Sequence, residues 1–218
     1  MKKYSLLVIP AVIILSSIPI SPAMSDFFNR PDFFEKGRRE FENEIRRFEQ
    51  REGRTPNSSL KLNPTSLPWT RVFIEKAGFT LLMPPGATTH ETKTVADSKG
   101  NINFDIIATH PPSSRYVIAY SEEVTPARFQ DSQEVLKKSR DEIISNNVGL
   151  RKVADKDITF NRQYPGKQFK LQNKNETIVF RLLLIRQRLY VLAVSQQTPD
   201  ALSTKSINTF FESFQLTK

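Results

Sequence analysis

The chain has 218 residues, of which 38% are hydrophobic, and a formal net charge of +9 at pH 7. This length suits one domain of ordinary size with an extension, and the hydrophobic content is sufficient for a packed core. The chain has no cysteine, which excludes disulfides, a thiol nucleophile, a lipidated N-terminal cysteine and a zinc–thiolate site.

Residues 1–23 have the pattern of an export signal. Lys2 and Lys3 precede an apolar run from Leu6 to Ile20, and Ser21-Pro22-Ala23 supplies small residues where a signal peptidase cleaves. The run is shorter than the roughly 20 residues that a membrane-spanning helix needs. We therefore expect a signal peptide and an exported protein that works outside the cytoplasm.

The segment 24–53 predicts an amphipathic, phenylalanine-rich helix. Its polar positions are dense in Glu and Arg, and its apolar positions recur at helical spacing. An exposed apolar stripe of this kind is typical of a binding surface. We expect residues 32–52 to bind a membrane protein or a second copy of the chain. The apolar stripe consists of Phe34, Phe41, Ile45 and Phe48.

A linker and a globular domain follow the predicted helix. Residues 54–68 are rich in Pro, Ser and Asn, which is typical of a linker. In the domain, 69–218, the first half predicts short strands separated by turns that contain Gly or Pro. These strands are expected at Val72–Glu75, Phe79–Met83, His90–Val95, Ile102–Thr109 and Tyr116–Tyr120.

The second half of the domain predicts a helix, further strands and a final helix. The first helix is expected to begin at Pro126, with Thr125 as its cap, and to end near Gly149. The final helix is expected to begin at Thr198 and to carry Phe214 on its apolar face. The strands between these helices are expected at Asp157–Phe160 with the residues that lead into it, Lys167–Gln172, Thr177–Arg186 and Leu189–Ser195.

The order of these elements predicts the α+β class. Hairpin turns between consecutive strands favour an antiparallel sheet, and two amphipathic helices can flank it in an α/β/α sandwich. Both parities of Ile178–Ile185 are apolar except at Arg181. We therefore expect this strand to lie in the sheet interior, covered on both faces.

The positive charge is concentrated in the globular domain. Without residues 1–23 the net charge is +7, and residues 69–218 hold 21 basic and 15 acidic residues. A basic exported protein is expected to meet an anionic protein face or membrane surface rather than nucleic acid. The alternative is that basic side chains at strand ends only prevent unwanted edge pairing. The candidate partner-binding residues are Arg162, Lys167, Lys170, Arg181, Arg186 and Arg188.

Motifs for catalysis, metals and cofactors are missing from the sequence. The two histidines, His90 and His110, have no ligand at metal-binding spacing. Serine-hydrolase, dinucleotide-binding and phosphate-loop motifs are also missing. The pairs Glu122-Glu123 and Asp155-Lys156-Asp157 are more typical of solvated turns than of an acid–base site. We expect no cofactor, no metal and no enzymatic activity.

Four short segments carry a resemblance to a known family: Gly78-Phe79-Thr80-Leu81-Leu82-Met83-Pro84-Pro85-Gly86, Tyr164-Pro165-Gly166-Lys167-Gln168-Phe169, Arg188-Leu189-Tyr190-Val191-Leu192 and Phe211-Glu212-Ser213-Phe214. They resemble PsbP-like domains, as found in small exported cyanobacterial proteins of unknown function. The resemblance covers residues 69–218, without the N-terminal helix. It implies an antiparallel sheet flanked by helices and a non-enzymatic accessory role in the periplasm or thylakoid lumen, as PsbP relatives have at photosystem II.

The sequence favours two functions over a third, a hydrolase whose catalytic carboxylates are distant in sequence and converge only in the fold. The first is an exported binding or assembly module that docks an anionic or membrane-associated partner, peripheral to a membrane. The second is a carrier of a small apolar ligand or lipid, which would need a cavity between the sheet and the helices.

Overall fold

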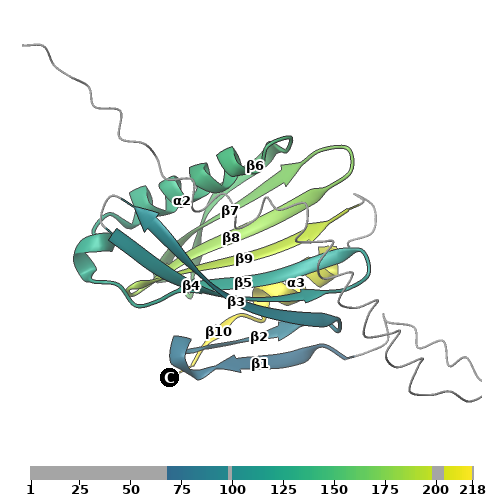
Figure 1. Cartoon of the computed structure of the whole chain (residues 1–218), viewed down its shortest axis with the longest axis horizontal. Coiled ribbons are helices and arrows are strands. Elements are labelled where there is room, and N and C mark those ends of the chain that lie inside the picture. Colours follow the sequence, from purple (N-terminus) through teal and green to yellow (C-terminus); the bar gives the residue numbers. More distant parts are fainter. Residues whose placement is uncertain (1–67, 98–99, 198–203, 218) are drawn as a thin grey trace, which may run out of the picture.

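The computed structural model describes residues 68–97, 100–197 and 204–217, which form two antiparallel β-sheets and two α-helices (Figure 1). The predicted α+β class is confirmed. The predicted signal peptide, the helix 24–53 and nearly all of the linker 54–68 lie outside the described residues, as do Phe34, Phe41, Ile45 and Phe48. In the part that is described, no helix combines the length and the apolar character needed to cross a membrane.

The strands are divided between a seven-stranded and a three-stranded sheet. In the large sheet the order is β3-β4-β5-β9-β8-β7-β6, and in the small sheet it is β1-β2-β10. The strands are β1 (Thr70–Ile74), β2 (Phe79–Met83), β3 (Ala87–Asp97), β4 (Gly100–His110), β5 (Ser114–Ser121), β6 (Arg151–Phe160), β7 (Tyr164–Gln172), β8 (Thr177–Ile185), β9 (Arg188–Gln196) and β10 (Gln215–Leu216).

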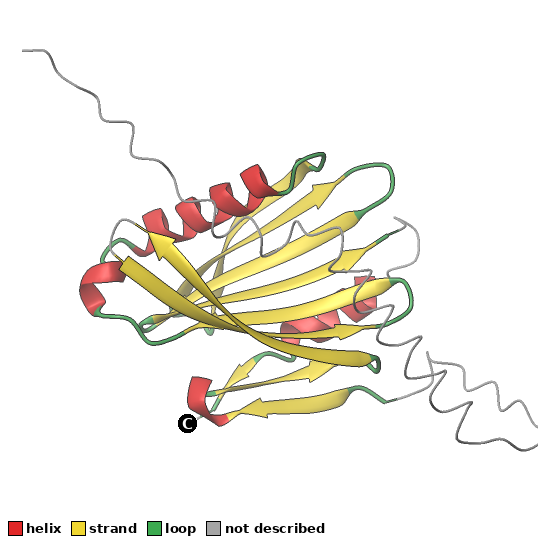
Figure 2. Cartoon of the chain, viewed as in Figure 1, coloured by secondary structure: helices red, strands yellow, loops and turns green. Residues whose placement is uncertain are grey.

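Each predicted strand is present, and most are longer than the sequence pattern indicates. β2 has the predicted bounds, whereas β6 begins six residues before the predicted Asp157, at Arg151. The expectation of a single sheet is wrong because β1 pairs with β2 and β2 pairs with β10, whereas neither β1 nor β2 pairs with β3. The large sheet therefore has α2 on one face, and α3 shares the other face with the small sheet (Figure 2).

The first long helix begins later than predicted. Pro126–Phe129 forms a separate 3-10 turn, and α2 spans Ser132–Asn146. The Asp131 carboxylate accepts a hydrogen bond of 2.9 Å from the backbone N–H of Glu134, whereas the Thr125 side chain caps nothing. Asp131 thus accepts a hydrogen bond from one of the free N–H groups in the first turn of α2. Thr125 lies seven residues before the start of α2 and cannot reach these groups.

The last helix, α3, spans Thr204–Glu212, and the predicted cap Thr198 lies outside the described residues. Phe214 was expected on the apolar face of this helix, but it follows the helix in the connection to β10. It is nevertheless buried and packs against Phe79, Phe160 and Tyr190. Phe214 therefore belongs to the core although its local structure is not helical.

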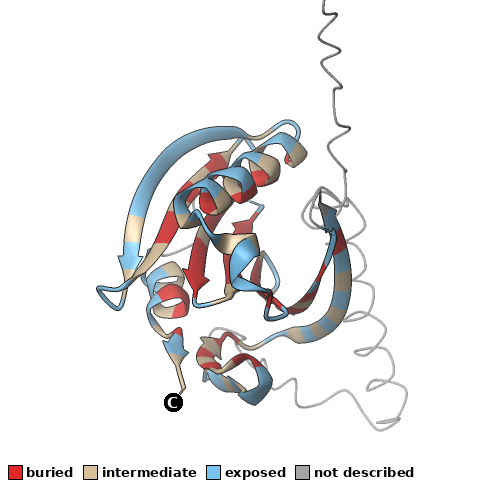
Figure 3. Cartoon of the chain, turned by 90° about the vertical axis from the view of Figure 1, so that its left-hand side faces the viewer, coloured by how far each residue is buried: buried red, intermediate tan, exposed pale blue. Residues whose placement is uncertain are grey.

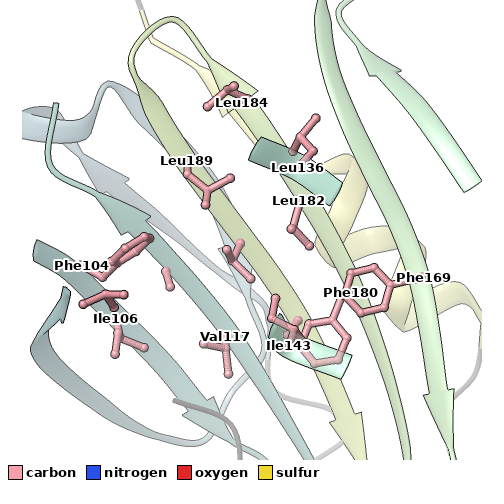
Figure 4. Close-up of a cluster of buried hydrophobic side chains, with 14 of the residues drawn as sticks. Phe104, Ile106, Val117, Leu136, Ile143, Phe169, Phe180, Leu182, Leu184 and Leu189 are labelled. Atoms are coloured by element: carbon pink, nitrogen blue, oxygen red, sulfur yellow. The ribbon is translucent and has the colours of Figure 1, made fainter. Parts of the chain in front are cut away.

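Two apolar clusters fill the faces of the large sheet. On the α2 side, Leu136 and Ile143 pack against side chains of β7, β8 and β9 (Figure 4). On the other side, Phe210 and Phe211 of α3 join the small sheet over β5, β8 and β9. The interior strand β8 contributes to both clusters, so its predicted coverage on both faces is confirmed.

The β7–β8 pair approaches closely at Gly166. A Cβ atom placed there would lie 2.6 Å from the Leu182 carbonyl oxygen and 2.8 Å from a methyl group of Leu183. Contacts below 3.0 Å with backbone force the strands apart. Glycine at this position therefore allows Ile158 of β6 and Leu183 of β8 to pack over β7.

Candidate functional site

The edge strand β6 separates its charges by face. Asp155 pairs in register with Phe169 and Asp157 with Lys167, which places both carboxylates on the α2 side. Lys156 pairs with Gln168 and therefore points to the α3 side. Figure 3 shows that β6 is exposed along most of its length at the rim of the sheet.

The α2-side carboxylates are already compensated by neighbouring cations. Asp155 accepts hydrogen bonds of 2.8 Å from Arg140 of α2 and 2.8 Å from Lys152. Burial alone would raise the pKa of Asp155, but these two cations outweigh it and lower the pKa below its usual range. Asp157 forms an ion pair with Lys167, whose side chain is only 11% exposed. Both carboxylates therefore form ion pairs with side chains of the domain itself.

The α3 side of the same strands carries cations without acids. Arg151 and Lys156 are exposed on β6, and Lys170 is half-buried on β7. Among the described residues of β6, β7 and β8, no acidic side chain lies on this face, and these three residues form no ion pair there. We refer to Arg151, Lys156 and Lys170 as the basic face.

Arg181 lies beside the basic face but is held by the fold. Its Nε and Nη2 donate hydrogen bonds of 3.1 and 2.9 Å to Oε1 of Gln168, and its Nη1 donates one of 3.1 Å to the carbonyl of Phe211. The guanidinium also lies over the Phe211 ring at 4.7 Å. Burial lowers the pKa of Arg181, and Glu212 opposes this. Arg181 therefore fastens the end of α3 to β8.

Three of the other predicted residues lie together at one end of the large sheet. Arg162 and Arg186 occupy neighbouring hairpin turns with φ of +59° and +55°, which are left-handed conformations uncommon for residues other than glycine. Arg188 donates a hydrogen bond of 2.9 Å to the carbonyl of Ser121 and one of 3.3 Å to that of Lys76. It thus ties β9 to β5 and to the turn after β1.

The structure therefore separates the six basic residues predicted from the sequence into four places. Lys170 lies on the basic face and Arg181 beside it, Lys167 lies on the opposite side of the sheet, and the remaining three lie at the sheet end. Sequence reasoning missed Arg151 and Lys156. The register shift between Lys152 and Ala154 explains why Arg151 lies on the α3 side. A bulge reverses the face of every residue that precedes it, so simple alternation from Lys156 would have placed Arg151 on the α2 side.

Two hollows lie at the end of the large sheet that carries Arg186. The larger, of about 470 Å³, is lined by the segment Glu122–Thr125 with Ala127 and Arg128. The smaller, of about 100 Å³, lies between the β8–β9 turn and the small sheet, and its lining includes Ile185–Arg188, Tyr190, Ala77-Gly78 and Leu216-Thr217. The lining of the larger hollow mixes charged and apolar side chains, which differs from the predominantly apolar cavity that a lipid carrier needs.

A second polar group lies on the α2 side near the start of β5. Arg115 is buried, which lowers its pKa to about 9, while Glu91 opposes the shift. Burial and the charge of Arg115 together lower the pKa of His110 to about 4. The His110 Nε2 atom lies 3.1 Å from the Thr89 hydroxyl. His110 is therefore neutral at pH 7 and serves the packing of this end of the sheet.

The carboxylates that the sequence offers as metal ligands or acid–base groups have other partners in the described ranges. Within residues 68–97, 100–197 and 204–217, no three His, Asp or Glu side chains are placed to hold a metal ion. Glu122 accepts hydrogen bonds from Asn103, and Glu123 lies 3.6 Å from Arg188. These carboxylates stabilise loop and strand contacts.

Comparisons with known proteins do not identify a family. No protein-family model matches the chain, and no curated protein matches its sequence.

Proposed function

We propose that this chain is an exported, non-catalytic binding module that docks an anionic partner protein through the basic face. The supporting observation is the one-sided charge of β6 and β7, where the acids turn to α2 and are paired while Arg151, Lys156 and Lys170 are not. The signal pattern of residues 1–23 supports export, and the periplasm or thylakoid lumen is the proposed location.

Protection of a sheet edge does not require basic and acidic side chains to lie on different faces of the sheet. Lysines anywhere on an edge strand discourage unwanted pairing. Lys156 and Lys170 are diagonal neighbours on adjacent strands, roughly 7 Å apart, so their repulsion opposes folding slightly. An acidic partner surface converts that repulsion into attraction and speeds the encounter. Docking therefore explains the arrangement better than edge protection.

The finer fold and the N-terminal helix form part of the same proposal. An antiparallel sheet with α2 on one face and α3 on the other supports a PsbP-like domain with an accessory role. Residues 32–52, with the apolar stripe Phe34, Phe41, Ile45 and Phe48, would tether the domain to a membrane protein or a second copy. The domain then supplies the electrostatic contact and the helix the apolar one.

The test compares two charge reversals of equal size in the full chain. Lys156→Glu with Lys170→Glu alters the basic face, and Lys137→Glu with Lys138→Glu alters the exposed surface of α2. Binding to membranes of the native host is measured at low and high salt, before and after protease treatment of those membranes. We expect only the basic-face variant to lose binding, and protease treatment to remove the binding of the wild type.

Two outcomes would contradict the proposal. Equal loss in both variants would show that net charge, and not the basic face, determines binding. Undiminished binding to protease-treated membranes, or to vesicles of the extracted lipids, would identify the lipid surface as the partner instead of a protein.

A further inference from the structure

β6 is an open edge of the large sheet. It pairs with β7 on one side, and among the described residues no strand pairs with its other side. Its length of ten residues exceeds that of most strands, and Val153 is 41% exposed near its start. An edge of this kind presents unpaired backbone N–H and C=O groups to solvent.

A strand added to β6 would meet different chemistry on its two faces. Its side chains would alternate between the α2 side and the α3 side. On the α2 side they would meet Asp155 and Asp157, whose charges Arg140, Lys152 and Lys167 already neutralise. On the α3 side they would meet Lys156, with Lys170 one strand further in. Acidic residues at alternate positions of the added strand would lie on the α3 side and form ion pairs with Lys156 and Lys170.

The bulge sets where such a strand fits. Pairing between β6 and β7 is regular from Ala154 to Phe160 and shifts before Ala154. A regular strand therefore has seven residues of β6 to pair with, because a bulge bends its strand and disrupts the ladder. This length suits the extended peptides that add to sheet edges in other recognition domains.

We infer that β6 binds an extended acidic segment of the partner protein by strand addition, with acidic side chains at alternate positions facing Lys156 and Lys170. The inference rests on the proposed function, because it names how the anionic partner is held. Main-chain hydrogen bonds would supply affinity, and the cations would fix which face of the segment turns toward α3.

The probe is a fluorescent peptide of alternating glutamate and threonine, measured by anisotropy with the full chain. Two further peptides carry N-methyl groups, one on every glutamate and the other on every threonine. In an extended strand, alternate N–H groups point to opposite edges. Strand addition therefore predicts that one methylated peptide loses binding by at least tenfold and that the other binds like the parent.

Variants of the chain provide the matched control. Lys156→Glu is expected to weaken binding of the parent peptide about fivefold at low salt, as for loss of an exposed ion pair. Lys137→Glu, with the same change of charge on α2, is expected to leave binding unchanged. Hydrogen exchange should show new protection within residues 151–160 and none in β3, the other edge strand.

The outcomes separate this inference from the proposed function. If both methylated peptides bind like the parent while Lys156→Glu still weakens binding, the anionic docking stands and strand addition is wrong. If the parent peptide does not bind at all, or protects β3 instead of β6, the inference is overturned. If Lys156→Glu and Lys137→Glu weaken binding equally, the basic face itself is not the site and the proposed function fails as well.

Discussion

Replacing Arg181 by methionine should destabilise the domain without weakening the docking of an anionic partner. The side chain makes charged hydrogen bonds to Gln168 and to the carbonyl of Phe211, and it lies over the Phe211 ring. Each of the two acceptors contributes about 1 kcal/mol net, and the ring contact contributes about 0.5–1 kcal/mol. Release of the buried charge offsets part of this loss. We expect the free energy of unfolding to fall by about 2 kcal/mol.

The assay is urea unfolding of the wild type and Arg181→Met, followed by circular dichroism and fluorescence. A loss of about 2 kcal/mol corresponds to a decrease in Tm of roughly 4–8 °C for a domain of this size. Arg181→Lys should recover only part of the stability, because an ammonium group lacks the planar fork that reaches both acceptors. Lys170→Met is the control, and its stability should differ from that of the wild type by less than about 0.5 kcal/mol.

One result would refute this reasoning. If Arg181→Met is as stable as the wild type but no longer binds the acidic peptide, Arg181 contacts the partner directly. The assignment of Arg181 to the fastening of α3 would then be wrong, and the basic face would extend onto β8.

Three further predictions concern stability. Gly166→Ala should lower the free energy of unfolding by about 2 kcal/mol or more, because the added methyl group meets β8 backbone; chemical denaturation measures it. Asp131→Ala should lower the free energy of unfolding by about 1 kcal/mol through loss of the α2 cap, whereas Thr125→Ala should leave α2 unaffected. Helical ellipticity and Tm measure both variants, and equal effects would show that Asp131 is not the cap. The pKa of His110 is about 4 in the folded state and near 6.5 when unfolded, so the unfolded chain binds more protons between these values. The contribution of His110 to stability should therefore be full above pH 6.5 and decline toward pH 4. If the free energy of unfolding of His110→Gln falls as steeply between pH 6.5 and pH 4 as that of the wild type, His110 is not the group responsible.

Strands with a strong apolar pattern could be predicted from the sequence. β8 combines apolar residues of both parities with hairpin turns, so its position inside the sheet follows from local information. β10 could not be found because two residues carry no periodicity. The separation of the small sheet depends on the pairing of β2 with this strand, which is a long-range contact.

The start of α2 shows how two valid local signals compete. Thr125 followed by Pro126 is a good helix start, and so is Asp131 with Glu134 three residues later. The chain uses the first for a 3-10 turn and the second for the helix. Propensity alone does not rank the two, because the packing of Leu136 and Ile143 against the sheet decides which turn continues.

The candidate site was less accessible to sequence reasoning than the fold. The concentration of basic residues from Arg162 onward was visible, but strand alternation and hairpin turns distribute these residues over both faces and one end of the sheet. Strand alternation alone places Lys156 on the face of the sheet opposite to that of Asp155 and Asp157. Arg151 joins it only because of the bulge after Lys152, which no composition or spacing rule reveals.

The pairing of β10 with β2 also has a consequence for how the domain is completed during synthesis. Gln215 lies opposite Thr80 and Leu216 opposite Phe79, so the small sheet joins segments separated by about 135 positions of the chain. A growing polypeptide emerges from its N-terminal side, and contacts of such sequence separation form late and slowly. The domain therefore cannot close its small sheet until residue 216 has left the ribosome, and a nascent chain that stops before this point exposes the side of β2 that β10 would cover.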